Sequence, residues 1–435
     1  MRRSLPPALA SLAYRDFTLL WAGQFISTLG TQIQTVALGW LVYTLTGSVA
    51  LLGGIGLARA IPTILLSLFG GTLADQVDRR RLLLLSQTAL AACSALLAIA
   101  IQGGLTDVVL LYTFAVVTAA GSAVDAPTRQ AFIPALVPRE NLANALTLNV
   151  LAANVAAVAG PAAGGLIIGW LGTAACYWLD AVSFFAVVAA LVAMRARPGA
   201  IDLPRRGFGA LVDGLTFVRD RPILWQLMVI DFFAVLFASR SGLLPVFAES
   251  VLKVGAEGLG LLYAAVSFGA VFGAVLFAFV PHPRQPGRMV GLTILAYGAV
   301  LGAFGLVRSF PLALMLLALS GGLDAASMAL RQTVRQLTTP DSLRGRVGAL
   351  SSVFSAGGPR LGDFQSGMLA SMTGAGNAMV IGGLACMLMV VTSRRWGPEL
   401  WRYRGDAVHL AGGTERLLTA ERAHQPDADV VHGAE

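Results

Sequence analysis

The sequence predicts an all-α membrane protein with twelve transmembrane helices, arranged as two six-helix bundles. Composition is one reason: 56% of the 435 residues are hydrophobic and 12% are charged, where soluble domains carry about 25% charged residues. The other two reasons are a series of long apolar segments and an alternation of positive charge between them. The net charge of +8 does not indicate nucleic acid, because the arginines are spread over short loops without interleaved aromatic residues.

Twelve segments approach the length of about 20 apolar residues that a helix needs to cross a bilayer. They lie at 17–43, 49–69, 82–102, 108–127, 143–169, 173–194, 223–247, 258–280, 289–307, 310–330, 346–370 and 375–393. The first is unusually long and the eleventh is rich in glycine. No short apolar segment with a small-residue cleavage site precedes the first one, so we expect the N-terminus to be retained.

Positive charge alternates between the loops. With the N-terminus inside, 26 of the 31 Lys and Arg residues fall on the cytoplasmic side. Three lie within segments (Arg59, Arg240, Arg360), and two face outward (Lys253, Arg308). The positive-inside rule then predicts a multi-pass membrane protein with both termini in the cytoplasm. Only one of these basic residues is a lysine, which indicates a GC-rich bacterial gene and hence the bacterial inner membrane.

One long connection, residues 195–222, divides the segments six and six. It holds six arginines, and its apolar residues recur at helical spacing, which predicts a helix in the membrane interface. We therefore expect four parts: an N-terminal bundle (1–194), this cytoplasmic linker, a C-terminal bundle (223–393) and a partly disordered cytoplasmic tail (394–435).

The two halves resemble each other in one detail. An Arg-Gln pair follows the fourth segment (Arg129-Gln130) and the tenth (Arg331-Gln332), a shift of 202 residues. We interpret it as a sign of duplication, which is typical of transporters built from two related bundles.

Seven charged side chains inside the apolar segments are candidates for a role in function, because an ion in such a segment usually faces protein or a water-filled cavity and has a partner. We interpret the one in the sixth segment as structural. The seven are Arg59, Asp180, Asp231, Arg240, Asp324, Arg360 and Asp363.

The acids among them have different possible partners. Arg360 and Asp363 are one helical turn apart and can pair on one face, so a purely structural pair stays open. Asp231 and Asp324 have no basic residue three or four positions away. We expect them to be the proton-linked acids, unless Arg59 or Arg240 neutralises them permanently.

Residues 70–83, "GGTLADQVDRRRLL", carry the most specific loop motif. Gly71, Asp75, Arg79 and Arg80 resemble the loop signature of the major facilitator superfamily, with departures at two other positions. The resemblance implies a loop that clamps the two bundles together while the cavity faces outward. It also implies that a carboxylate of the fourth segment, here Asp125 beside Arg129, pairs with Arg79. An ordinary positive-inside anchor is the alternative.

The fifth segment contains "AVAGPAAGG", residues 157–165. Gly160, Pro161, Gly164 and Gly165 resemble the Gly-Pro-x-x-Gly-Gly signature of exporters in the same superfamily. Close packing of helices through small residues would explain the glycines equally well.

Residues 243–265 and 337–350 resemble the branch of drug and siderophore exporters that includes the enterobactin exporters. In that architecture, segments one, four, seven and ten line the cavity, and segments two, five, eight and eleven meet between the bundles. The resemblance therefore implies that every listed intramembrane charge except Asp180 lies on the substrate and proton pathway.

The function implied by the resemblance is secondary active export of a small amphipathic compound, siderophore or drug-like, by alternating access and proton antiport. The expected partners are the substrate, protons and the lipid bilayer, with no cofactor and no metal, and the expected state is a monomer. Desolvated Arg59, Arg240 and Arg360 would favour an acidic substrate.

Two other functions are compatible with an all-α membrane protein to different degrees. An uptake carrier on the same scaffold remains open, because only the motif of the fifth segment indicates export. A membrane-embedded enzyme is disfavoured, because all four histidines lie outside the apolar segments and the only lysine, Lys253, does not follow glycine as a Walker A motif requires. The cysteines, too, lack metal-ligand spacing. They are Cys93, Cys176 and Cys386.

Overall fold

The computed structural model describes residues 7–76, 78–195, 215–279, 285–339 and 344–403, and the regular structure in these residues is helical. Helices are expected for apolar sequence in a bilayer, because a helix satisfies its backbone N–H and C=O groups within its own segment. For these residues the all-α prediction is confirmed.

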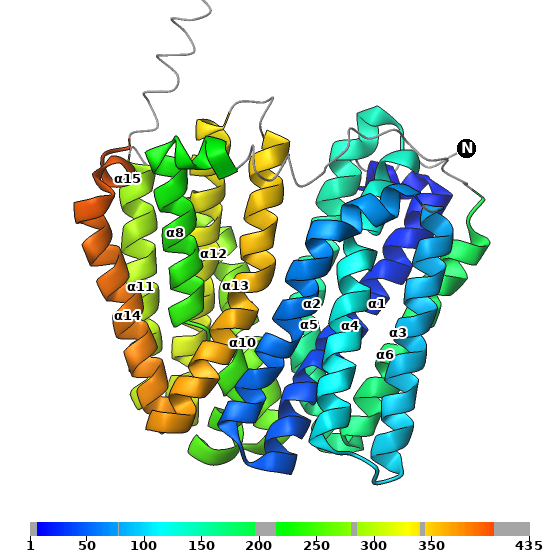
Figure 1. Cartoon of the computed structure of the whole chain (residues 1–435), viewed down its shortest axis with the longest axis horizontal. Coiled ribbons are helices and arrows are strands. Elements are labelled where there is room, and N and C mark those ends of the chain that lie inside the picture. Colours follow the sequence, from blue (N-terminus) through cyan, green and yellow to red (C-terminus); the bar gives the residue numbers. More distant parts are fainter. Residues whose placement is uncertain (1–6, 77, 196–214, 280–284, 340–343, 404–435) are drawn as a thin grey trace, which may run out of the picture.

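The N-terminal bundle, on the right in Figure 1, consists of six long helices. They are α1 (Arg15–Thr46), α2 (Val49–Gln76), α3 (Arg79–Gln102), α4 (Val108–Phe132), α5 (Leu142–Leu171) and α6 (Thr173–Ala193). α6 packs against α1 and α3, α4 packs against α2 and α3, and α5 packs against α1.

The C-terminal bundle lies on the left in Figure 1. Its long helices are α8 (Pro222–Phe237), α10 (Gly255–Ala278), α11 (Pro286–Leu306), α12 (Phe310–Thr338), α13 (Arg344–Thr373) and α14 (Ala375–Trp396). α12 packs between α10 and α11, α14 packs against α11, and α13 packs against α8.

A short helix, α15 (Pro398–Arg402), follows α14 outside the spans. The side chain of Gln226 on α8 donates a hydrogen bond to Glu399 Oε2 at 2.5 Å and accepts one from the Leu400 backbone N–H at 3.2 Å. The bond from Gln226 lowers the pKa of Glu399. This side chain thereby ties α15 to α8.

Eleven segments of the described chain are long and apolar enough to cross a membrane. The 30-residue helix α13, which carries the Gly-rich eleventh segment, is the remaining long helix. The two groups of six helices confirm the twelve-helix architecture. Most of the expected linker (195–222) and of the tail lies outside the described residues, although residues 215–219 are helical.

Two helices continue beyond the apolar segments that predicted them. α4 ends at Phe132 and α12 ends at Thr338, so Arg129 and Arg331 lie on helices and not in the loops where the sequence placed them. Each arginine forms an ion pair with an aspartate inside the protein. A hydropathy pattern cannot detect such a partner, which is why the predicted segments ended too early.

The seventh span is broken. α8 ends at Phe237, a 3-10 turn follows at Ser241–Leu243, and a π-helical turn covers Phe247–Val251. A break at membrane depth frees backbone groups that must find other partners in the protein. These partners come from three neighbouring helices.

The two bundles touch at the end of the molecule where α1 ends and α2 begins, which is the lower end in Figure 1 and is called the closed end here. Here α2 packs against α13, and α5 packs against α10. Glycine makes this approach possible: a side chain on Gly53 would collide with the backbone of Gly367, and one on Gly165 with that of Gly260.

Two polar contacts also join the bundles at the closed end. The hydroxyls of Tyr43 on α1 and Ser250 in the π-helical turn lie 2.5 Å apart. The indole N–H of Trp170 on α5 donates to Glu257 Oε1 on α10 at 3.0 Å. Any motion that separates the bundles at this end must break both hydrogen bonds.

Candidate functional site

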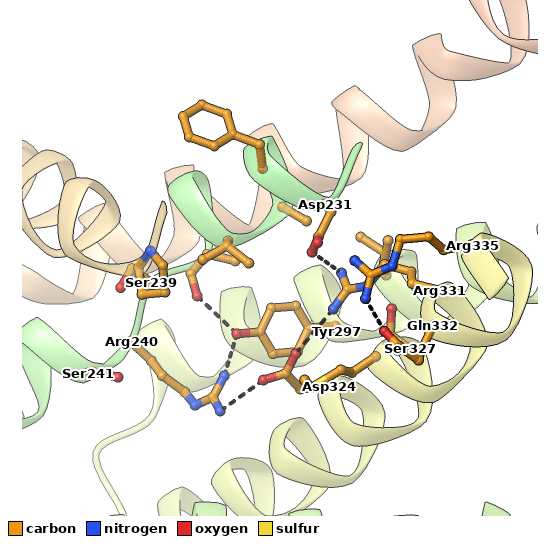
Figure 2. Close-up of a pocket in the computed structure, with 17 residues that line it drawn as sticks. Asp231, Ser239, Arg240, Ser241, Tyr297, Asp324, Ser327, Arg331, Gln332 and Arg335 are labelled. Atoms are coloured by element: carbon orange, nitrogen blue, oxygen red, sulfur yellow. Dashed lines mark hydrogen bonds and ion pairs between the residues drawn. The ribbon is translucent and has the colours of Figure 1, made fainter. Parts of the chain in front are cut away.

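A cavity of about 350 Å³ lies between α8, α11 and α12 of the C-terminal bundle. Apolar residues of α8 form part of its wall, and charged and hydroxyl groups converge on it (Figure 2). An apolar pocket with a few converging polar groups is typical of sites for small organic ligands. The polar lining residues are Asp231, Ser239, Arg240, Ser241, Tyr297, Asp324, Ser327, Arg331, Gln332 and Arg335.

A row of alternating charges crosses this cavity. Arg331 on α12 lies 2.7 Å from Asp231 on α8 and 4.0 Å from Asp324 Oδ1 on its own helix. Arg240, in the break of span seven, lies 3.4 Å from Asp324 Oδ2. Figure 2 shows the resulting order of Asp231, Arg331, Asp324 and Arg240. Two carboxylates thus balance two guanidinium groups.

The members of this row differ in their access to the cavity. The side chain of Asp324 is 42% exposed and that of Asp231 is 29% exposed, against 11% for Arg331 and 14% for Arg240. Arg335, one turn beyond Arg331, adds a third positive charge to the lining and donates to Gln332 and Ser351. An entering ligand therefore meets a lining with an excess of one positive charge.

Three of the predicted pathway residues lie elsewhere. Arg59 on α2, with Arg360 and Asp363 on α13, lies where the two helices meet between the bundles. Asp363 Oδ1 accepts hydrogen bonds from Ser239 Oγ at 2.6 Å and from the Gly242 N–H at 2.9 Å. The structure therefore brings together Asp231, Arg240 and Asp324 in the cavity and places the other three as a separate group.

Asp180, interpreted from the sequence as structural, is buried in the N-terminal bundle. Its carboxylate accepts a hydrogen bond from Ser94 Oγ at 2.6 Å and one from Thr31 Oγ1 at 3.5 Å. These bonds connect α6 to α3 and α1. Among the described residues, no three His, Cys, Asp or Glu side chains gather in a way that could hold a metal ion.

The acid of the fourth span has partners within its own bundle. Asp125 is buried, pairs with Arg129 at 3.2 Å, and accepts hydrogen bonds from Gln87 at 2.7 Å and Ser86 at 3.2 Å. Arg80 donates to the C-terminal carbonyls of α6, at 2.6 Å for the nearer one.

The rest of the loop motif is less fully described. The side chains of Asp75 and Arg79, and the surroundings of Gly71, lie outside the described part of the chain. The expected pair of Asp125 with Arg79 and the clamp therefore stay predictions.

The glycines of the fifth-span motif contact two neighbouring helices, α1 and α10. Gly160 and Gly164 face α1, where a side chain on Gly160 would collide with Gln32 and one on Gly164 would come within 3.2 Å of the Ile33 carbonyl. Gly165 faces α10 across the bundle interface. Helix α5 continues through Pro161 to Leu171.

Seven of the polar lining residues were not identified from the sequence, among them Tyr297, Arg331, Gln332 and Arg335. The Arg331-Gln332 pair was recognised as an internal repeat, but the segment boundary placed it in a loop. Helical spacing offered the missing signal, because Arg331 is seven residues, about two turns, from Asp324 and thus on the same face. Tyr297 carried no such signal within its apolar segment.

Comparison with known families decides the class of this protein. The family model described as "Transmembrane secretion effector" (MFS_3), of the major facilitator superfamily, matches residues 7–399. The chain belongs to this family. It is accordingly a multi-pass membrane transporter, and the expected membership of the major facilitator superfamily is confirmed.

Curated relatives support the siderophore-exporting branch. The chain is 27% identical over 391 residues to a protein of Shigella boydii named "Enterobactin exporter EntS", covering 87% of this chain and 93% of the relative. It is 28% identical over 337 residues to a protein of the same name from Escherichia coli, covering 75% and 80%.

Solved structures share the fold. A bacterial homologue of the human lysosomal transporter Spinster, in an inward-facing and unoccupied conformation, superposes with a TM-score of 0.69 at 16% identity and covers 92% of this chain and 98% of its own. A bacterial homologue of the iron transporter ferroportin, in an inward-facing state, gives a TM-score of 0.67 at 17% identity, with 88% and 98% covered. At these identities the likeness establishes the fold alone.

Proposed function

We propose that this transporter exports a small amphipathic organic anion of the siderophore type across the bacterial inner membrane by alternating access. Its match to proteins named enterobactin exporters, over most of both chains, supports the direction and the substrate class. The observation that carries the proposal is the row of charges in the cavity, where Arg240 and Arg331 lie against Asp324.

The cavity suits an acidic ligand with an apolar body. Guanidinium groups bind carboxylate and catecholate oxygens through paired hydrogen bonds, and their attraction is stronger where water is excluded. The carboxylate of Asp324 lies 3.4 Å from the guanidinium of Arg240 and 4.0 Å from that of Arg331. Both distances are longer than a strong ion pair, so another acceptor could bind these arginines more tightly. An anion would compete with this carboxylate for Arg240 and Arg331, while the apolar wall of α8 would hold its hydrocarbon part.

The contact between the bundles at the closed end supports alternating access. The distribution of arginines predicts that this end faces the periplasm. With the bundles in contact there, the cavity would be accessible from the cytoplasm, which is the state in which an exporter loads its substrate. Release would then require separation of α2 from α13 and of α5 from α10.

The charge of the substrate decides how protons can couple to transport. Protonation of Asp324 would free Arg240 and Arg331, so a proton and an anion would support each other's binding, whereas a proton and a cation would compete. Proton antiport through this acid therefore requires a cationic or neutral substrate. An anion could instead leave down the membrane potential, which contributes about 2.3 kcal/mol per charge per 100 mV.

Transport assays in cells that lack the gene test the proposal. We expect cells without the transporter to retain a catechol-carboxylate siderophore that wild-type cells release, and dissipation of the membrane potential to reduce the release. Genes encoding Arg240→Gln or Arg331→Gln should fail to restore release. Arg308→Gln, which removes an exposed charge in the loop before α12, is the matched control. Lower retention in the deleted strain would instead indicate uptake.

A further inference from the structure

We propose that Asp363 is a positioning residue for transport, which holds the break in span seven so that Arg240 points into the cavity and which couples this break to the opposite bundle through Arg59. This proposal rests on the proposed function of the cavity. It assigns Asp363 a role through other residues, not direct contact with the substrate.

The first step is the backbone of the break. Three side chains from three helices satisfy groups that the interrupted helix leaves open. The Tyr297 hydroxyl on α11 donates to the Ala238 carbonyl at 3.1 Å, and the Tyr263 hydroxyl on α10 donates to the Ser241 carbonyl at 3.0 Å. Asp363 on α13 accepts from the Gly242 N–H at 2.9 Å. The break is thus built by its neighbours, because backbone groups at this depth have no other partners.

The second step is the position of Arg240. Both hydrogen bonds to Asp363 end on the same oxygen, Oδ1, and their donors, Ser239 Oγ and the Gly242 N–H, flank Arg240 on either side. The guanidinium of Arg240 can then donate to the Tyr297 hydroxyl and reach Asp324. One carboxylate oxygen therefore fixes the segment that carries a cavity arginine.

The third step is the tight contact between the break and α13. A side chain on Gly242 would lie 3.0 Å from the Asp363 Cβ, and one on Gly362 would lie 2.8 Å from the Ser239 Cβ. The two elements leave no space between them in which the break could shift alone. Movement of α13 must therefore move Arg240.

The fourth step leads to the N-terminal bundle. Gly56 on α2 packs against the Asp363 Cβ, where an added side chain would come within 3.1 Å. Arg59, less than one turn further along α2, is one of the charged groups that act on Asp363, and its Nε has no hydrogen-bond partner. The other charged and titratable groups that act on Asp363 are Arg360 on its own helix and Tyr263 on α10.

These contacts give Asp363 two separable functions. Oδ1 accepts the two bonds that hold the break, and this needs an oxygen but no charge. Attraction to Arg59 needs the charge, and it favours the state in which α2 and α13 touch at the closed end. Opening that end would remove Arg59 from the carboxylate that positions Arg240.

The substitutions Asp363→Asn and Asp363→Ala separate the two functions. In full-length protein reconstituted in nanodiscs, we measure the Kd for 2,3-dihydroxybenzoate, hydrogen exchange of residues 238–243, and spin-label distances across the closed end. Asn keeps an Oδ1 acceptor, so we expect the Kd to stay within about twofold and the exchange to be unchanged, while the distances shift toward separation. Ala should weaken binding roughly tenfold or more and raise the exchange. Asp107→Asn, at the N-cap of α4, is the matched loss of charge.

A milder substitution keeps the proposal testable if Asp363→Ala does not fold. Ser239→Ala keeps the carboxylate and removes one of the two bonds, so it should raise the exchange of residues 238–243 less than Asp363→Ala and leave the closed-end distances unchanged. Equal behaviour of Asp363→Asn and Asp363→Ala in all three measurements would overturn the proposal. If wild-type protein does not bind 2,3-dihydroxybenzoate, the proposed substrate class fails, and the exchange and distance measurements still decide the role of Asp363.

Discussion

The guanidinium of Arg331 lies 2.7 Å from the carboxylate of Asp231, and this ion pair joins α12 to α8 across the wall of the cavity. The same guanidinium lies 4.0 Å from Asp324. Both acids that the sequence singled out as proton-linked therefore share one arginine. A change at Arg331 should affect both of them, which makes this residue the most direct way to test the charged row.

Replacement of Arg331 with Gln should abolish transport while the protein still reaches the membrane. The substitution leaves Asp231 without its ion-pair partner and removes one of two candidate anion-binding groups. A hydrogen bond to a charged ligand contributes about 1.5–3 kcal/mol, so we expect ligand affinity to fall roughly ten- to a hundredfold. Equilibrium binding of 2,3-dihydroxybenzoate to purified protein measures this directly.

The paired variant Asp231→Asn with Arg331→Gln is the control for stability. Removal of both partners avoids an uncompensated charge, so its thermal unfolding should lie closer to that of the wild type than that of Arg331→Gln alone. Ligand binding should remain lost. Recovery of both stability and binding would mean that Arg331 acts only as a partner for Asp231.

Removal of the charge of Asp324 should strengthen anion binding. Asp324→Asn removes the negative charge that holds Arg240 and Arg331, so both guanidinium groups become available to the ligand. Equilibrium binding of 2,3-dihydroxybenzoate to purified protein should therefore give a lower Kd for Asp324→Asn than for the wild type.

The contrary outcome would also be informative. If Asp324→Asn binds the anion more weakly than the wild type does, the neutral form of this residue opposes binding, and the expectation of proton antiport would gain support over movement down the membrane potential. Asp231→Asn serves as the comparison here, because Asp231 faces only one of the two arginines.

The fold could be predicted from the sequence because hydropathy and charge act over whole segments. A helix that must satisfy its own backbone in lipid leaves an apolar segment of characteristic length, and the loops carry the arginines. The ends of the helices were harder to predict from the sequence. α12 continues to Thr338, and Arg331 forms its ion pair inside the protein. The mean hydropathy of a segment falls at such an arginine, so a hydropathy pattern assigns it to a loop.

The candidate site was predictable only in part, because it depends on which helix faces meet. The sequence identified Asp231, Arg240 and Asp324, which do converge on the cavity. It grouped Asp363 with them as a pathway residue. The Gly242 N–H, which binds Asp363, belongs to a break in span seven that no residue pattern predicted. Tyr297 is one aromatic residue in an apolar segment, and its contact with Arg240 exists only in three dimensions.

Asp180 should tolerate loss of its charge better than the cavity acids. Its carboxylate is buried among Ser94 and Thr31 within the N-terminal bundle, away from the charged row. Asp180→Asn keeps an acceptor for Ser94, so we expect transport to stay within about twofold of the wild type. Asp180→Leu should lower thermal stability, because it leaves the buried Ser94 hydroxyl without its acceptor. Loss of transport by the Asn variant at normal expression would show that Asp180 belongs to the transport mechanism.

A bulky residue at Gly165 should hold the closed end open. Gly165 lies against the Gly260 backbone, and no side chain fits between α5 and α10 at this point. Gly165→Leu should therefore separate the bundles at the closed end and stop transport, because a carrier that cannot close one side cannot alternate. Spin labels on α5 and α10 near Trp170 and Glu257 would report a longer distance. Gly302→Leu on α11, where no atom lies within 4 Å of an added Cβ, is the matched control and should transport normally. A wild-type distance in Gly165→Leu would show that this contact is not what closes the transporter.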